Sequence, residues 1–245
     1  MQRYFIEDKK SADGYLTITG DDAKHITKVM RQSVGEELIA VVAGKVYLAK
    51  ITDIDLDVQV KLIRELEDRS ELPKKVTIAC GLPKGDKLEL ITQKATELGM
   101  NALLPYSAER SIVKWDGAKS IKKIERLKKI AKEAAEQSHR SHIPDIQAVH
   151  SFKELANVVK NYDVAIVAYE EEAKKSGGRR FAEILESLYD KDSILLVFGP
   201  EGGISETEAA ALKEAGALFT ALGPRILRTE TAPLYALSAI SYEFE

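Results

Sequence analysis

The sequence predicts an α/β protein with a small β domain over residues 1–70 and a larger parallel-sheet domain over residues 73–245. Three observations support this class. Before residue 65, short apolar segments alternate at the strand period of two. After Pro73, apolar runs alternate with helix-length amphipathic segments, which is typical of a parallel sheet covered by helices. Finally, the apolar runs at residues 195–198 and 218–222 each stop at a Gly-Pro pair.

The first domain is predicted to contain short strands and one helix. Alternating apolar residues predict strands at 15–19, 38–42, 46–51 and 58–62. Ala43-Gly44-Lys45 separates the middle two and predicts a hairpin turn. Residues 21–32 predict a helix that Asp21 or Asp22 caps. This mixture indicates a small barrel.

The second domain follows a charged segment at residues 65–71, which predicts a linker. Gly99 is expected to stop the first helix and Ser151 to cap a later one. The predicted strands are residues 76–80, 102–106 and 163–168, with a short extended piece at 143–149. The predicted helices are residues 84–98, 119–138, 151–159 and 180–189.

The C-terminal part carries the strongest candidate ligand site. A covered strand at 195–198 runs into a glycine-rich loop, and Ser205 to Glu208 fit a capping box for the next helix. The strand at 218–222 ends at Gly223-Pro224, and Thr229 or Thr231 is expected to cap the last helix. Because parallel strands share one carboxyl edge, both loops are expected to meet where ligands bind.

Composition limits the function classes. The net charge of −3 does not indicate nucleic-acid binding by the chain as a whole, so local basic patches must supply it. Cys80 is the sole cysteine, which excludes an internal disulfide, and its apolar surroundings indicate a buried side chain. No apolar run reaches the length of a membrane span, and the N-terminus lacks the apolar core of a signal peptide. We therefore expect a cytoplasmic protein that does not enter the membrane.

One region is clearly basic, from Arg110 to Lys132, and Trp115 stands among its charges. Cations there could contact phosphates and the indole could stack on an unpaired base, although such runs are also typical of solvated helix faces. His139, His142 and Asp145 match no familiar ligand spacing, so no metal site is predicted. The loop at residues 81–87 lacks Walker spacing, and no GxGxxG motif follows a strand.

The motifs GPEGGIS and LGPRILRTETA together resemble the signature of SPOUT methyltransferases, and most closely the family that methylates N3 of a uracil in small-subunit ribosomal RNA. The resemblance implies S-adenosylmethionine as cofactor, a trefoil knot in the second domain, a PUA-like RNA-binding first domain and a homodimer. It implies 16S ribosomal RNA, within the small ribosomal subunit, as substrate. The alternatives are a non-catalytic RNA-binding protein, or a SPOUT enzyme that methylates a ribose 2′-OH or guanine.

The resemblance also implies site residues. The cofactor-binding candidates are Tyr169, Phe198, Gly199, Glu201, Gly202, Leu222, Gly223, Ile226, Leu227 and Arg228. The RNA-binding candidates are Arg3, Arg31, Lys84, Arg110, Lys114, Trp115 and Arg140.

Methylation of a uracil nitrogen needs a proton acceptor and a group that holds the charge left on the base. Arg228 is predicted to stabilise that charge. Glu201 or Glu230 could accept the proton if burial raises its pKa, and the sequence leaves the choice open. A purely structural alternative is that Glu230 caps its helix and pairs with Arg228.

Overall fold

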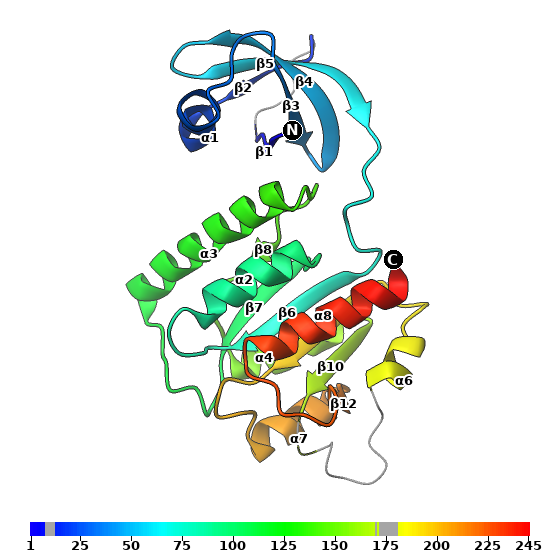
Figure 1. The fold of residues 1–245 in the computed structure, drawn as a ribbon. Coiled ribbons are helices and arrows are strands. Elements are labelled where there is room, and N and C mark those ends of the chain that lie inside the picture. The colour runs from blue at the N-terminus through cyan, green and yellow to red at the C-terminus, as the bar shows by residue number, and fades with distance from the viewer. Residues whose placement is uncertain (8–12, 170, 172–180) are drawn as a thin grey trace. The chain divides into compact units, whose positions relative to one another are not determined.

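The computed structural model describes residues 1–7, 13–169, 171 and 181–245. The described residues form two compact units (Figure 1). One comprises residues 1–71 and 135–142, and the other comprises residues 72–134 and 143–245. No described helix is long and apolar enough to cross a membrane.

The first unit contains a sheet in the order β1-β3-β4-β5-β2. Its strands are β1 (Arg3–Phe5), β2 (Tyr15–Ile18), β3 (Glu37–Val42), β4 (Lys45–Ile54) and β5 (Val58–Leu66). The pairs are antiparallel except for β1 with β3. The predicted hairpin joins β3 to β4, and Ala43 and Gly44 both have positive φ (48° and 76°), as tight hairpin turns require. Alternate strand residues such as Leu38, Ala40 and Val60 fill the core of this unit.

The predicted helix at 21–32 is shorter and irregular. It consists of α1 (Gly20–Lys24), preceded by Thr19 without a side-chain cap, and a π-helix, η1 (His25–Val29). The prediction of an Asp21 or Asp22 cap was therefore wrong. The helix ends because Arg31 adopts a left-handed φ of 53°. Ala23 and Ile26, three positions apart, both belong to the core of this unit.

The second unit is built on a parallel sheet in the order β12-β10-β11-β6-β7-β8, with β9 beside β7. The strands are β6 (Lys75–Gly81), β7 (Ala102–Ser107), β8 (Asp145–Ile146), β9 (His150–Ser151), β10 (Val164–Ala168), β11 (Ser193–Phe198) and β12 (Leu218–Thr220). The helices are α2 (Lys87–Glu97), α3 (Gly117–Gln137), α4 (Phe152–Val158), the 3-10 turn η2 (Val159–Asn161), α6 (Phe181–Glu186), α7 (Glu206–Glu214) and α8 (Thr231–Phe244). The alternation of strands and helices expected from the sequence is confirmed.

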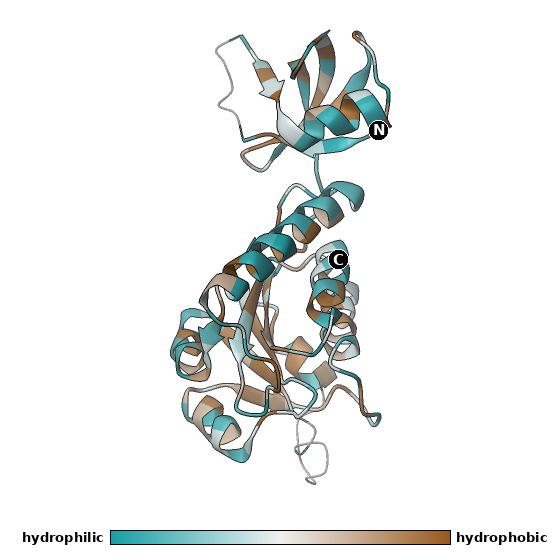
Figure 2. Ribbon diagram, turned by 90° about the vertical axis from the view of Figure 1, so that its left-hand side faces the viewer, coloured by the Kyte–Doolittle hydropathy of each residue, from teal (hydrophilic) through white to brown (hydrophobic). Residues whose placement is uncertain are grey.

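Both faces of this sheet are covered by helices, with apolar strand residues between them (Figure 2). Ile78, Leu196 and Phe198 belong to a core shared with α2, α3, α6 and α8. Their neighbours Ala79 and Val197 belong to a core shared with α4 and α7. Successive residues of each strand thus point into two different apolar cores, one on each face of the sheet. This explains why the strands are apolar throughout.

Most local helix signals behave as the sequence predicts. Ser151 and Ser205 each form a complete capping box, with Glu154 and Glu208 respectively. Gly99 follows α2 with φ of 91°, as a helix stop requires. The prediction for the last helix was wrong: Glu230 occupies the N-cap of α8 and no side chain caps it.

An ion pair connects the two chain segments of the first unit, residues 1–71 and 135–142. The Arg140 side chain is 2% exposed and its guanidinium binds the Glu71 carboxylate. Glu71 Oε1 also accepts hydrogen bonds from the backbone amides of Ser141 (2.9 Å) and His142 (3.0 Å). Glu71 therefore belongs to a fixed structure, although the sequence predicts a linker there.

We expect Glu71→Gln to lower the free energy of unfolding by about 3 kcal/mol, because it removes the carboxylate charge that the buried Arg140 guanidinium binds. Urea denaturation followed by circular dichroism measures the effect. Glu67→Gln is the matched control, since the Arg69–Glu67 pair is 84% and 76% exposed. Loss of an exposed pair should change stability by less than about 0.5 kcal/mol. Equal effects of the two substitutions would contradict a structural role for the buried pair.

Candidate active site

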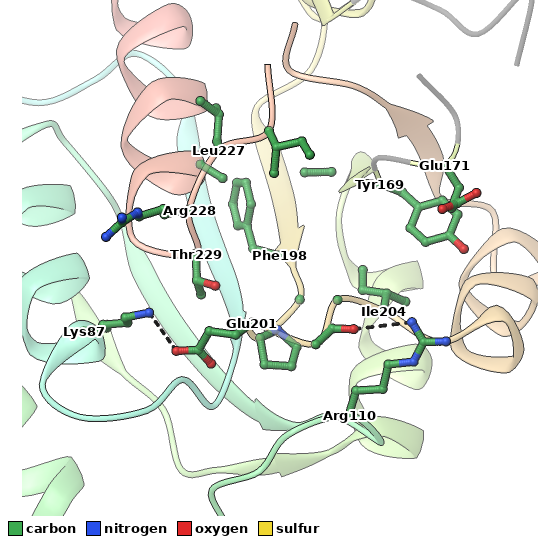
Figure 3. A pocket seen from close by; sticks show the side chains of 17 residues that line it. Lys87, Arg110, Tyr169, Glu171, Phe198, Glu201, Ile204, Leu227, Arg228 and Thr229 are labelled. Atoms are coloured by element: carbon green, nitrogen blue, oxygen red, sulfur yellow. Dashed lines mark hydrogen bonds and ion pairs between the residues drawn. The ribbon is translucent and has the colours of Figure 1, made fainter. Parts of the chain in front are cut away.

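A cavity of about 550 Å³ lies at the carboxyl ends of β10 and β11 (Figure 3). The strand order reverses between β11 and β6, so the cavity lies beside a switch point, where open parallel sheets bind ligands. Its volume falls in the range of small-molecule sites. The cavity is lined by Lys87, Arg110, Ala168, Tyr169, Glu171, Phe198, Gly199, Pro200, Glu201, Gly202, Gly203, Ile204, Ile226, Leu227, Arg228, Thr229 and Ala232.

The loop after β11 is shaped by glycines that other residues could not replace. A Cβ atom at Gly199 would lie 2.8 Å from the Gly203 carbonyl carbon. The Gly203 amide donates to the Pro200 carbonyl (2.8 Å) and Gly203 has a φ of 71°, so this loop is a tight turn. The turn brings its backbone to the edge of the cavity.

Arg110 lies against the same loop. A Cβ atom at Gly202 would lie 2.9 Å from both the Cβ and the carbonyl oxygen of Arg110. In return, Arg110 Nη1 donates to the Gly202 carbonyl (3.3 Å), and Figure 3 shows this contact at the mouth of the cavity. Glycine at 202 is therefore required by close packing.

Glu109 fixes the segment that carries Arg110. Its carboxylate accepts hydrogen bonds from Ser205 Oγ (2.6 Å) and Thr207 Oγ1 (3.0 Å), and its amide donates to Glu208 (2.8 Å). The bonds from Ser205 and Thr207, with a smaller contribution from Arg110, lower the pKa of Glu109 although burial opposes this. The β7–α3 segment is thereby anchored to the start of α7.

The loop after β12 forms the other wall. A smaller adjoining cavity of about 100 Å³ is lined by Tyr169, Leu222, Gly223, Ile226 and Leu227, among others. The Tyr169 ring packs edge-on against Phe219, with centroids 5.8 Å apart. Ile226 is 79% exposed and lines both cavities, so its apolar surface is available to a ligand.

The candidate proton acceptors both face Lys87. Lys87 Nζ lies 2.9 Å from Glu201 Oε1 and 3.5 Å from Glu230 Oε2. Burial would raise the pKa of Glu201, but hydrogen bonds from Lys87, from its own amide and from the Lys84 amide outweigh burial and lower it. The condition for Glu201 to act as a base, a pKa raised by burial, is therefore not met.

Arg228 is exposed and lines the cavity. The predicted alternative, a pair between Arg228 and Glu230, does not form: Glu230 approaches Lys87, and Arg228 makes no ion pair with any residue that the structure describes. Its guanidinium is free to face a charged ligand.

The predicted cofactor residues come together, whereas the predicted RNA contacts separate into two groups. All ten cofactor candidates line the two cavities. Arg31, Lys84, Arg110 and Lys114 are exposed. Arg3 and Arg140 are buried and pair with Asp68 and Glu71, and Trp115 packs against the sheet core. The buried ion pairs of Arg3 and Arg140 are a correction to their expected role as RNA contacts, whereas Trp115 is only partly buried and its stacking on a base stays a prediction.

Sequence reasoning missed several lining residues: Lys87, Glu171, Ile204, Thr229 and Ala232. A usable signal existed for Lys87, because it begins a helix directly after a strand that ends at the carboxyl edge. No group of three or more His, Cys, Asp or Glu side chains that could hold a metal ion occurs among the described residues.

The comparisons with known proteins identify the relatives of this chain. Residues 70–241 match an RNA methyltransferase domain family and residues 18–63 match an RNA methyltransferase PUA domain family. The chain is 48% identical to ribosomal RNA small subunit methyltransferase E of Bacillus subtilis, covering 100% of the chain and 98% of the relative. It is 33% identical to the protein of the same name from Mycobacterium bovis, over 97% of the chain and 90% of the relative.

Solved structures of methyltransferases have the same fold as this chain. The fold superposes with a TM-score of 0.85 on ribosomal RNA small subunit methyltransferase E from Neisseria gonorrhoeae bound to S-adenosyl methionine, at 27% identity over 98% of the chain and 96% of that structure. A putative methyltransferase from Legionella pneumophila in complex with the same cofactor gives a TM-score of 0.84 at 28% identity, over 98% and 96%.

We expect Gly81→Ala to destabilise the second unit by about 1–3 kcal/mol, because the new Cβ would lie 2.5 Å from Pro200 Cδ. Denaturant midpoints measure the loss. Gly117→Ala is the control: nothing lies within 4 Å of its Cβ position, so stability should stay within about 1 kcal/mol of the parent. If Gly81→Ala behaves like Gly117→Ala, the close contact between β6 and the loop after β11 is not a constraint.

Proposed function

The chain belongs to the RNA methyltransferase family that includes the ribosomal RNA small subunit methyltransferase E proteins, and we propose that it transfers a methyl group from S-adenosylmethionine to N3 of a uridine in 16S ribosomal RNA. The observation that carries this proposal is the cavity itself. Both signature loops, after β11 and after β12, form its walls at the carboxyl edge of the sheet.

The cavity fits S-adenosylmethionine. Phe198, Ile204 and Leu227 offer apolar surface for an adenine ring, and the glycine turn at 199–203 offers backbone groups at close range. Glu171 supplies a carboxylate, which suits the ammonium group of a methionine moiety. When bound, the cofactor supplies an electrophilic methyl group on a positively charged sulfur.

Arg228 is proposed to hold the charge of the uracil. N3 of uracil carries a proton at neutral pH, and its removal leaves negative charge on O2 and O4. A guanidinium with no protein counter-ion can stabilise that charge as it develops. Its exposed position in the cavity, without an ion pair to a described residue, supports this role.

Glu230 is proposed as the proton acceptor. Glu201 is engaged by Lys87 and by the Lys84 amide, and its lowered pKa does not suit a general base. Glu230 approaches Lys87 at the longer distance of 3.5 Å, and its side chain is 18% exposed. Its carboxylate therefore lines the junction with a looser contact to Lys87 than Glu201 has.

The two domains are proposed to have different roles, one in RNA binding and the other in cofactor binding and methyl transfer. Residues 1–70, with exposed Arg31, are proposed to bind RNA, and residues 73–245 to bind the cofactor and carry out the transfer. The exposed cations Lys84 and Lys114, and Arg110 at the cavity mouth, are proposed to contact RNA phosphates. Because the substrate belongs to the small ribosomal subunit, we propose a cytoplasmic location.

We further propose that the second domain is knotted and that the protein is a homodimer. The chain passes from β11 beyond β10 to β12 and then returns to α8, which supports a threaded C-terminus. Exposed Tyr235 and Tyr242 give α8 apolar surface suited to a second copy of the chain. Metal ions are not required by this proposal.

The function is tested by mass mapping of ribosomal RNA nucleosides after incubation of undermethylated small subunits with the protein and S-adenosylmethionine. We expect one new methyl group on N3 of a uridine. A methyl group on ribose or guanine would indicate a related specificity. RNA binding without methyl transfer would indicate a non-catalytic RNA-binding protein.

We expect Arg228→Ala to bind S-adenosylmethionine within about tenfold of the parent but to lose about 10²- to 10³-fold in turnover, because its role is in the transition state. Gly202→Val provides the contrast. Its side chain would collide with Arg110 and move the loop, so cofactor binding itself should be lost while the protein stays folded. Calorimetry and turnover on small subunits separate the two. Turnover of Arg228→Ala near the parental value would remove Arg228 from the mechanism.

A further inference from the structure

Lys87 connects the two walls of the cavity. It is the first residue of α2, after β6. Its ammonium lies 2.9 Å from Glu201, in the loop after β11, and 3.5 Å from Glu230, at the start of α8 (Figure 3). One cation therefore contacts acidic groups from both loops that form the cavity.

The two carboxylates compensate for an unfavourable position of the Lys87 charge. A lysine in the first turn of a helix lies at the positive end of the helix dipole, where a cation is disfavoured. The carboxylates of Glu201 and Glu230 offset that cost, and without Lys87 these two negative charges would face each other. The hydrogen bond to Glu201 is the main reason that the pKa of Lys87 is raised, so its charge persists at neutral pH.

Neighbouring contacts hold the same junction together. The Lys84 amide donates to Glu201 Oε1 (3.1 Å), and Gly81 permits Pro200 to approach β6 closely. The side chains of Lys87, Glu201 and Glu230 are 34%, 30% and 18% exposed, so the group is partly shielded from solvent. Because these ion pairs are partly buried and supported by a backbone hydrogen bond, we expect them to contribute more than a fully exposed ion pair does.

We propose that Lys87 is a positioning residue for methyl transfer, which sets the separation of the two cavity walls by binding Glu201 and Glu230 at once. This inference rests on the proposed function. Lys87 acts through the two carboxylates: Glu201 fixes the turn at 199–203, and Glu230 fixes the start of α8 beside Arg228. Its removal loosens both walls and therefore weakens cofactor binding.

The test uses Lys87→Met, which keeps much of the side-chain length and removes the charge. Calorimetry with S-adenosylhomocysteine should show an affinity loss of about tenfold, since close charged partners couple by that order. Lys87→Arg should recover most of the affinity, because a guanidinium can reach both carboxylates. Lys94→Met is the matched control on the same helix: Lys94 pairs with Glu97 within α2 and touches neither loop, so its affinity should stay within about twofold.

A double-mutant cycle separates positioning from a general structural effect. In the Glu201→Gln/Glu230→Gln background, Lys87→Met should cause no further loss of affinity, because its partners have already lost their charges. An undiminished effect in that background, or an affinity of Lys87→Met within twofold of the parent, would overturn the inference. Should Lys87→Met fail to fold, Glu230→Gln alone must still weaken cofactor binding, and unchanged affinity there would also overturn it.

The parent protein distinguishes this inference from the proposed function. If the parent methylates small subunits and Lys87→Met binds cofactor equally well, only the positioning role fails. If the parent binds the cofactor but transfers no methyl group, the proposed function fails, whereas the affinity cycle still reports on Lys87.

Discussion

The close approach of backbone segments at the carboxyl edge of β6 and β11 is the constraint on which the cavity depends. Gly81 leaves room for Pro200, Gly199 for Gly203, and Gly202 for Arg110. A Cβ atom on any of these three glycines would lie between 2.5 and 2.9 Å from the neighbouring segment, which is too close for a side chain. The loop after β11 is therefore held on both sides, by the end of β6 and by the segment after β7, before any ligand arrives.

The charged side chains around the loop after β11 have different partners. The acidic groups Glu201 and Glu230 turn towards Lys87, while Glu109 binds hydroxyl groups at the start of α7. Arg228 is left without an ion pair among the described residues and belongs to the lining of the cavity. A site in which one lysine binds two acidic groups, while a guanidinium has no ion pair to a described residue, is suited to a ligand that develops negative charge.

Burial decides which basic residues can meet RNA. Arg140 has the residue type expected of a phosphate contact, yet it is 2% exposed and binds Glu71. Arg110 is also basic but lies at the mouth of the cavity. Charge in a sequence thus indicates a capacity for phosphate binding, and the location of each side chain determines whether that capacity is available.

The sequence by itself determined the features that depend on near neighbours along the chain: the capping boxes of Ser151 and Ser205, the helix stop at Gly99, and the apolar strands that need two covered faces. It also predicted that both Gly-Pro loops lie at one edge, since that follows from parallel strands. Only the tertiary structure decided which distant residues meet. Lys87 and Glu201 are 114 positions apart, and Glu71 and Arg140 are 69 apart. Such pairings depend on strand order and packing, and no periodicity or local propensity encodes them.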